Sequence, residues 1–187
     1  MNKTVLICLV ILVIIGIGIF FFTNQGTKKD ETIQQSQTQE LTFDGRNTSF
    51  TIDGKSITLI NGISEMPIEN SSAKITTRYF GDEATGDLNG DGFSDTAFLI
   101  TQDKGGSGLF YYAVVAMRTA NGYKTTNAFF IGDRIAPQST YIPINSQELQ
   151  INYAERKSSE SMTTQPSVGA TLLLKVTSTG LLEGLMK

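Results

Sequence analysis

Beyond Leu41, short runs of apolar residues alternate with residues that favour turns, and helical periodicity is weak. Two of these runs, Ser49–Ile52 and Lys55–Leu59, flank the dipeptide Asp53-Gly54. Asp-Gly adopts the positive φ angles of a type I′ turn at little cost, so this stretch predicts a two-residue β-hairpin. The pattern therefore indicates strands rather than helices.

The same reasoning predicts further strands along the chain. Lys74–Phe80 alternates between two faces, and Asp95–Thr101 and Leu109–Met117 are apolar enough to be buried strands. Asn121-Gly122 predicts a second two-residue hairpin, which leads into Tyr123–Ile131. The remaining predicted strands are Thr140–Ile144, Glu148–Tyr153 and Ala170–Val176.

Some eight or nine strands joined by short turns favour a mainly β fold, an antiparallel meander or sandwich. Ile60–Ser72 and Gly180–Lys187 are the best places for short helices, which would make the fold α+β. The glycine-rich stretch Gly105–Gly108 is interpreted as a hairpin loop, because it matches no phosphate-binding motif.

The beginning of the chain has another pattern. Val5–Phe22 comprises eighteen residues without a charged side chain, close to the ~20 that a helix needs to cross a bilayer. We predict a transmembrane helix in residues 1–23 that acts as an uncleaved signal-anchor. A cleaved signal peptide is the alternative, but its apolar core is shorter and ends at a small-residue cleavage site, which the sequence around Phe22 lacks.

Residues 24–40 are almost entirely polar, with Ile33 as the one large apolar side chain. Such a stretch cannot bury enough surface to offset the entropy of ordering, so we predict a disordered linker. The chain is thus divided into an anchor (1–23), this linker (24–40) and a β-rich domain (41–187).

Composition narrows the function. The 187 residues include no His, no Trp and one Cys, which excludes a Ser-His-Asp triad, an imidazole zinc site and an internal disulfide. With 15 basic and 18 acidic residues, the net charge is -3. Nucleic acid requires a basic face, so we expect no nucleic-acid partner. No residue is assigned a catalytic role.

One constellation indicates metal chemistry. The stretch GDLNGDGFSD, Gly86–Asp95, has oxygen-bearing side chains at alternate positions, with Gly92 where a calcium loop bends sharply. Oxygen ligands without nitrogen or sulfur donors select Ca²⁺. The predicted ligands are Asp87, Asn89, Asp91, Asp95 and the backbone carbonyl of Phe93.

Position 12 of this loop is Phe98, where an EF-hand has a bidentate Glu. Because a strand is predicted to follow, the loop resembles instead the calcium loops of integrin-α-type (FG-GAP) repeats, of which the chain has one copy. A metal-free Asp/Gly turn is the alternative. If calcium binds, we expect it to have a structural role.

The distribution of charged residues around the loop also favours a bound cation. Asp82 and Glu83 add to the carboxylates of the loop, and no Lys or Arg lies between Arg78 and Lys104. Clustered carboxylates repel one another unless a cation neutralises them or they protonate. Extracellular calcium modules bind at ~10⁻⁴–10⁻³ M, so we place the domain outside the cytoplasm and the protein in the cell membrane as a single-pass protein.

Four stretches also resemble a domain of uncharacterised bacterial exported or membrane-anchored proteins. Together they cover most of the region from Phe50 to Val176. This resemblance implies a one-domain envelope protein of unknown activity and assigns no catalytic residue. The stretches are TIDGKSITLINGISE (Thr51–Glu65), RYFGDEATGDLNGDGFSDTAFLITQDKGGSGLFYY (Arg78–Tyr112), NAFFIGDRIAPQST (Asn127–Thr140) and INYAERKSSESMTTQPSVGAT (Ile151–Thr171).

These features favour a membrane-anchored, extracytoplasmic calcium-binding domain that serves as a binding module for an envelope protein partner. Two alternatives stay open. One is an envelope enzyme that uses carboxylate, Tyr or Lys chemistry without His. The other is a periplasmic inhibitor or assembly factor that docks through a sheet edge.

Overall fold

The computed structural model describes residues 42–185, and every regular element in this range is a strand. The predicted anchor (1–23) and linker (24–40) lie outside the described residues. Within residues 42–185, no helix has the length and apolar character needed to span a membrane.

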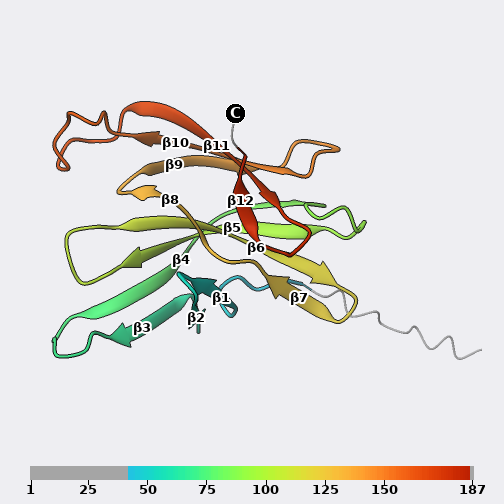
Figure 1. Ribbon diagram of the computed structural model, residues 1–187, viewed down its shortest axis with the longest axis horizontal. Coiled ribbons are helices and arrows are strands. Elements are labelled where there is room, and N and C mark those ends of the chain that lie inside the picture. Colours follow the sequence, from blue (N-terminus) through green and yellow to red (C-terminus); the bar gives the residue numbers. More distant parts are fainter. Residues whose placement is uncertain (1–41, 186–187) are drawn as a thin grey trace, which may run out of the picture. The chain divides into compact units, whose positions relative to one another are not determined.

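The twelve strands form three antiparallel sheets (Figure 1). A six-stranded sheet has the order β3-β4-β5-β6-β7, with β8 also paired to β6; a four-stranded sheet has the order β12-β11-β10-β9; and β1 and β2 form a hairpin. The strands are β1 (Ser49–Ile52), β2 (Lys55–Thr58), β3 (Ile63–Pro67), β4 (Lys74–Gly86), β5 (Asp95–Asp103), β6 (Phe110–Thr119), β7 (Gly122–Thr125), β8 (Phe129–Asp133), β9 (Ala136–Tyr141), β10 (Glu148–Glu155), β11 (Val168–Val176) and β12 (Leu182–Gly184).

Strands β5 and β6 are the centre of the fold, because both of their faces are covered. Side chains on one face, among them Leu99 and Val115, pack against the four-stranded sheet. Side chains on the other face, among them Phe98 and Val114, pack against the β1–β2 hairpin. Burial of both faces explains why both strands are uninterrupted apolar runs. In an antiparallel sheet with one solvent-exposed face, apolar and polar residues would alternate instead.

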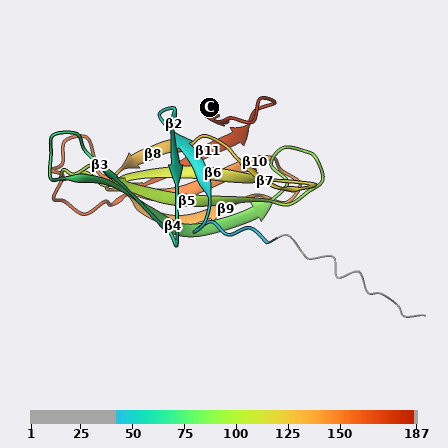
Figure 2. The ribbon, with the colours of Figure 1, turned by 90° about the horizontal axis from the view of Figure 1, so that it is seen from below.

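The β1–β2 hairpin is a third layer. In Figure 2 it crosses over β5 and β6 instead of running along them. Phe50 of β1 and Ile57 of β2 are almost fully buried, and the ring of Phe43 lies 5.4 Å from that of Phe98. The hairpin, with four residues in each strand and one turn between them, therefore covers the second face of the central sheet together with the residues packed around it.

Two predicted turns are confirmed. Ile52 pairs with Lys55, and the residues between them have the positive φ angles of a type I′ turn, 50° at Asp53 and 75° at Gly54. Gly105–Gly108 lies in the connection between the hairpin strands β5 and β6.

The hairpin predicted at Asn121-Gly122 exists, but its turn is one residue earlier. Thr119 pairs with Gly122, so Ala120 and Asn121 form the loop. The strand predicted at 123–131 is also broken into β7 and β8. The break occurs because the N–H of Ala128 donates to the carbonyl of Thr51 in the hairpin layer rather than to β6.

The predicted short helices at Ile60–Ser72 and Gly180–Lys187 are wrong for the residues described. The first contains β3, which pairs with β4 along its whole length. The second contains β12, where Leu182 is buried in the core and pairs with Val176. These two strands and the division of one strand into β7 and β8 raise the count from the nine segments predicted to twelve.

Candidate functional site

The predicted calcium loop connects β4 and β5, which are neighbours in the six-stranded sheet. Gly86, the last residue of β4, pairs with Asp95, the first residue of β5, so the ladder closes the loop at its base. Leu88 is 1% exposed and packs into the core beside Leu99. The second residue of the loop is therefore an apolar anchor, and the polar residues around it project from a fixed base.

The carboxylate of Asp87 accepts backbone hydrogen bonds from the loop that follows it. Its Oδ1 accepts the N–H groups of Gly90 and Asp91 at 2.7 and 3.2 Å, and its Oδ2 accepts that of Gly92 at 2.9 Å. These bonds, above all the one from Gly92, lower the pKa of the carboxyl. Gly90 and Gly92 have φ angles of 80° and 84°, which L residues rarely adopt, and this explains both glycines.

Asn89 and Asp91 each form a smaller turn. The side-chain oxygen of Asn89 accepts the N–H of Asp91, and Oδ1 of Asp91 accepts the N–H of Phe93, both at 2.9 Å. The Asn89 amide also donates to Oδ2 of Asp91. The Phe93 ring lies outside, with the guanidinium of Arg118 5.7 Å from its centre. Hydrogen bonds within the loop therefore fix the side-chain oxygens at the alternate positions that the sequence pattern identified.

Asp95 is the buried member of the set, at 0% exposure. Its Oδ2 accepts the N–H of Leu88 at 3.0 Å, and its Oδ1 accepts the N–H of Arg118, on β6, at 2.9 Å. Burial raises the pKa of this carboxyl, and the charges of Asp91 and Asp87 raise it further. Three carboxylates therefore lie near enough to one another to interact.

The donor set is compatible with calcium in its chemistry. A carboxylate has about four lone-pair positions, and the contacts above occupy three at Asp87 and two each at Asp91 and Asp95. Among residues 42–185, no three Asp, Glu, His or Cys side chains converge closely enough to hold an ion by themselves. A bound ion would therefore need Asn89 and backbone carbonyls as well.

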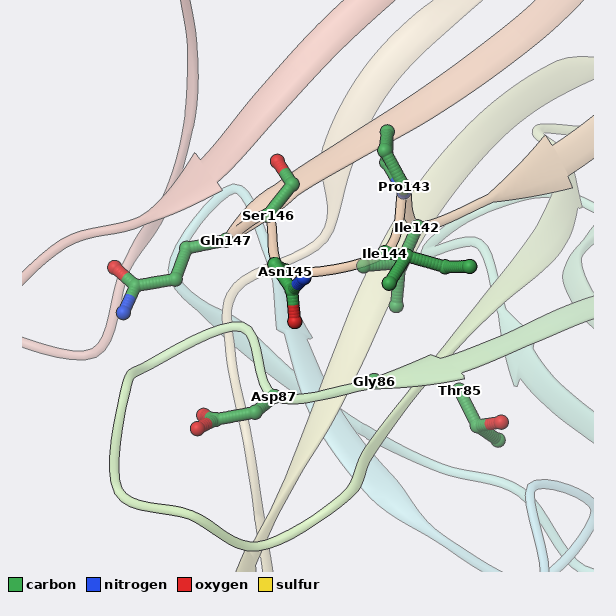
Figure 3. A pocket seen from close by; sticks show the side chains of 9 residues that line it. All are labelled: Thr85, Gly86, Asp87, Ile142, Pro143, Ile144, Asn145, Ser146 and Gln147. Atoms are coloured by element: carbon green, nitrogen blue, oxygen red, sulfur yellow. The ribbon is translucent and has the colours of Figure 1, made fainter.

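A cleft of about 470 Å³ adjoins the loop (Figure 3). Thr85, Gly86 and Asp87 form one wall, and the β9–β10 connection at 142–147 forms the other. A Cβ on Gly86 would approach Cγ2 of Ile142 to 2.9 Å, and the amide of Gln147 lies directly against Gly90. The cleft and the loop thus share a wall and are in contact at two glycines.

Sequence reasoning missed this cleft and the bond from Arg118 to Asp95. Asn145-Ser146-Gln147 is a visible polar cluster between Ile144 and β10, but nothing in the sequence places it against residues 85–90. The bond from Arg118 joins residues that are 23 positions apart in the sequence. It depends on the register of β5 against β6, which a turn motif in the sequence does not determine.

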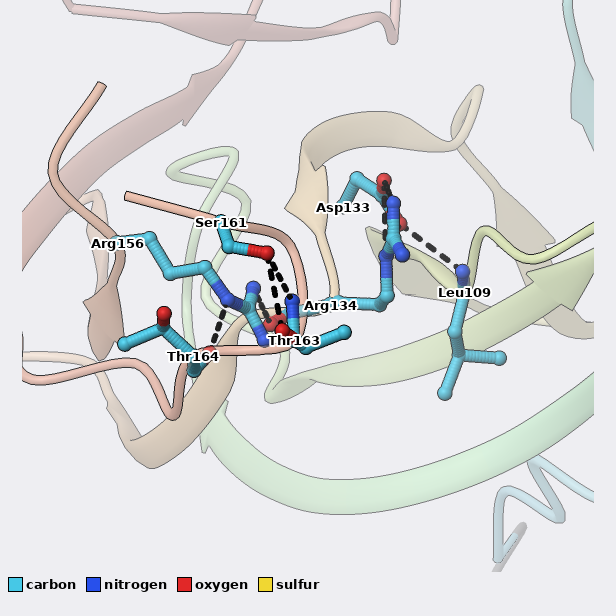
Figure 4. Close-up of polar contacts among 7 residues, drawn as sticks. All are labelled: Leu109, Asp133, Arg134, Arg156, Ser161, Thr163 and Thr164. Carbon is cyan, nitrogen blue, oxygen red and sulfur yellow. Dashed lines mark hydrogen bonds and ion pairs between the residues drawn. The ribbon is translucent and has the colours of Figure 1, made fainter. Parts of the chain in front are cut away.

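A second polar cluster lies where β8 turns into β9 (Figure 4). Asp133 accepts a 2.7 Å bond from Nη2 of Arg134 and a 3.0 Å bond from the N–H of Leu109. Arg156 donates to the backbone carbonyls of Arg134 and Thr164. The Arg134 guanidinium lowers the pKa of Asp133. Arg134 supplies the counter-charge of Asp133, and the hydrogen bonds of Asp133 and Arg156 tie three segments together.

No family model, curated protein or solved structure matches this chain. The resemblance to exported and FG-GAP-type sequences stays a prediction.

Proposed function

We propose that the chain is a membrane-anchored, extracytoplasmic β domain that binds Ca²⁺ in the loop from Asp87 to Asp95 and serves as a binding module of the cell envelope. The predicted ligands are Asp87, Asn89, Asp91, the carbonyl of Phe93 and Asp95. A transmembrane helix in residues 1–23 and the linker 24–40 complete the proposed architecture.

The observation that carries the proposal is the environment of Asp95. It is fully buried and lies near two other carboxylates, and none of the ion pairs among residues 42–185 includes Asp87, Asp91 or Asp95. Buried charge without a partner is costly. A divalent cation would remove that cost, and oxygen ligands alone favour calcium over softer metals.

The proposed role of the ion is structural. Asp95 already joins the start of the loop, through Leu88, to the end of β6, through Arg118. A cation held by Asp95 and Asp87 would fasten these segments to the end of β4. The ion supplies only charge neutralisation and ligand bonds in this role, and no reaction is proposed.

A binding module is favoured over an enzyme because the polar clusters serve packing. Asp133 is neutralised by Arg134, with a lowered pKa. The buried Gln102 donates a hydrogen bond to Thr77 at 3.1 Å, which joins β5 to β4. An acid–base catalyst needs a group poised to exchange a proton near neutral pH, and neither pair provides one.

Calorimetric titration of the full chain in zwitterionic micelles tests calcium binding. We expect a dissociation constant of ~10⁻⁴–10⁻³ M, and at least a tenfold weakening in Asp91→Ala. Asp103→Ala is the matched control, because Asp103 also accepts the N–H of the residue two positions later. Absence of calcium-dependent heat in the wild type would mean that the loop is a metal-free turn, and equal weakening by both variants would also contradict the proposal.

A further inference from the structure

We propose that the cleft between the end of β4 and the β9–β10 connection binds a small neutral saccharide. Its volume of about 470 Å³ lies within the ~300–1,000 Å³ of small-molecule sites. The inference rests on the lining of the cleft and does not require the calcium ion proposed above.

Hydrogen-bonding groups in the cleft are free to serve a ligand. Within residues 42–185, the side chains of Thr85, Asn145 and Gln147 have no hydrogen-bond partner. Each amide offers two donors and an acceptor, and the hydroxyl offers one donor and two lone pairs. Sugar hydroxyls also donate and accept, so this mixed set matches a polyol better than a ligand that only donates or only accepts.

The charge of the cleft argues against an anionic ligand. Among residues 42–185, no Lys or Arg lines it, and the one carboxylate that does, Asp87, already accepts three backbone N–H bonds. Phosphate and carboxylate ligands depend on cationic side chains or clustered N–H donors. A neutral ligand meets no such penalty here.

An aliphatic wall completes the match. Ile142, Pro143 and Ile144 line the same side of the cleft (Figure 3), and Ile144 is 93% exposed. The C–H face of a pyranose ring can cover such a surface while its hydroxyls reach the amides. Covering apolar area in this way adds affinity.

The backbone of the cleft argues against an extended peptide as the ligand. Peptides that add to a sheet require a straight edge with unpaired N–H and C=O groups. Residues 142–147 form a turn instead: the N–H of Ser146 donates to the carbonyl of Pro143, and Asn145 has a φ of 58°. Recognition here depends on side chains.

Nuclear magnetic resonance of the ¹⁵N-labelled full chain in zwitterionic micelles tests the proposal, because sugar-headed detergents would compete. The probes are maltose and N,N′-diacetylchitobiose, and the comparison is the peptide Ala-Gly-Ser-Ala with an acetylated N-terminus and an amidated C-terminus, which carries no charge. We expect the side-chain NH₂ signals of Asn145 and Gln147 to shift with at least one disaccharide. A response to the peptide alone, or to none of the three, would overturn the proposal, whether or not calcium binds.

Two variants locate the site. Asn145→Gly keeps the positive φ and removes the amide, and we expect it to weaken binding about three- to tenfold, as for the loss of one hydrogen bond. Asn70→Gly is the matched control, because Asn70 is exposed with a φ of 57°. Thr85→Val removes the hydroxyl at nearly constant shape and should weaken binding similarly. Unchanged affinity in both cleft variants would contradict the assignment.

Discussion

Asp95 and Asp133 each tie a strand to a distant segment through a backbone N–H, yet their surroundings differ. Asp133 is neutralised by Arg134, its neighbour in the chain, and its pKa is lowered. Asp95 is more deeply buried, lies near Asp91 and Asp87, and its pKa is raised. Both carboxylates therefore join a strand to a distant segment, but of the two only Asp133 has an arginine that balances its charge.

This difference indicates where the molecule depends on its surroundings. A carboxylate with its own arginine needs no added cation to offset its charge. A buried carboxylate among other carboxylates stabilises the fold fully only when a cation is supplied or when it protonates. The loop from Asp87 to Asp95 should therefore respond to ions and pH, whereas the Asp133 cluster should not respond to calcium.

The largest expected effect is that of Asp95→Ala. This change leaves the buried N–H of Leu88 and the partly buried N–H of Arg118 without an acceptor, each costing about 1–3 kcal/mol. Part of this is recovered because a buried charge is removed, so we expect a loss of about 2–3 kcal/mol in urea unfolding with chelator present. A loss below that of Asp133→Asn would show that the Asp95 bonds do not hold the loop.

A smaller effect is expected for Asp133→Asn. The ion pair with Arg134 is about one-quarter exposed on both sides, so solvent weakens it, and we expect a loss of about 1 kcal/mol in the same assay. The loss should be identical with and without calcium. A calcium-dependent loss would contradict the separation of the two clusters.

Gly92→Ala and Gly54→Ala form a matched pair. Both glycines have positive φ, 84° and 75°, and a Cβ at either would meet no atom within 4 Å. Each should lose about 1 kcal/mol from backbone strain alone. Only Gly92→Ala should also weaken calcium binding in a calorimetric titration; equal calcium affinity in the two variants would contradict the role of the loop.

The smallest expected effect is on the pH dependence of stability in chelator. Because the pKa of Asp133 is lowered on folding, its contribution is present above the ordinary value of 3.8 and is lost as pH falls below it. Because the pKa of Asp95 is raised, its contribution is present below 3.8 and is lost as pH rises through the folded value. Asp133→Asn and Asp95→Asn should therefore change the slope of unfolding free energy against pH in opposite directions, and slopes of the same sign would contradict these environments.

Local signals in the sequence predicted local structure well. Asp53-Gly54 specified its hairpin because two adjacent residues there determine the turn. At Asn121-Gly122 the turn moved by one residue, since the register of β6 against β7 and β8 is set by packing across the whole sheet. Ile63–Pro67 becomes a strand because β4 is available beside it, and no property of these five residues reveals that partner.

The candidate site also combines features that the local sequence determines with features that depend on the tertiary fold. The alternation of Asp87, Asn89 and Asp91 is visible in the sequence because each bonds within five residues of itself. The bond of Asp95 to Arg118 and the contact of Gln147 with Gly90 depend on the tertiary fold. The chemistry of the loop could therefore be predicted, while its attachment to β6 and to the cleft could not.

The most direct measurement is the free energy of unfolding of the full chain with chelator and with about 5 mM calcium. For affinities of ~10⁻⁴–10⁻³ M, mass action predicts that calcium adds about 1–2 kcal/mol. Asp91→Ala should lose about 1 kcal/mol of this increment, as a tenfold weaker affinity requires, and Asp103→Ala and Asp133→Asn should keep it. Equal wild-type stability in calcium and in chelator would contradict the account.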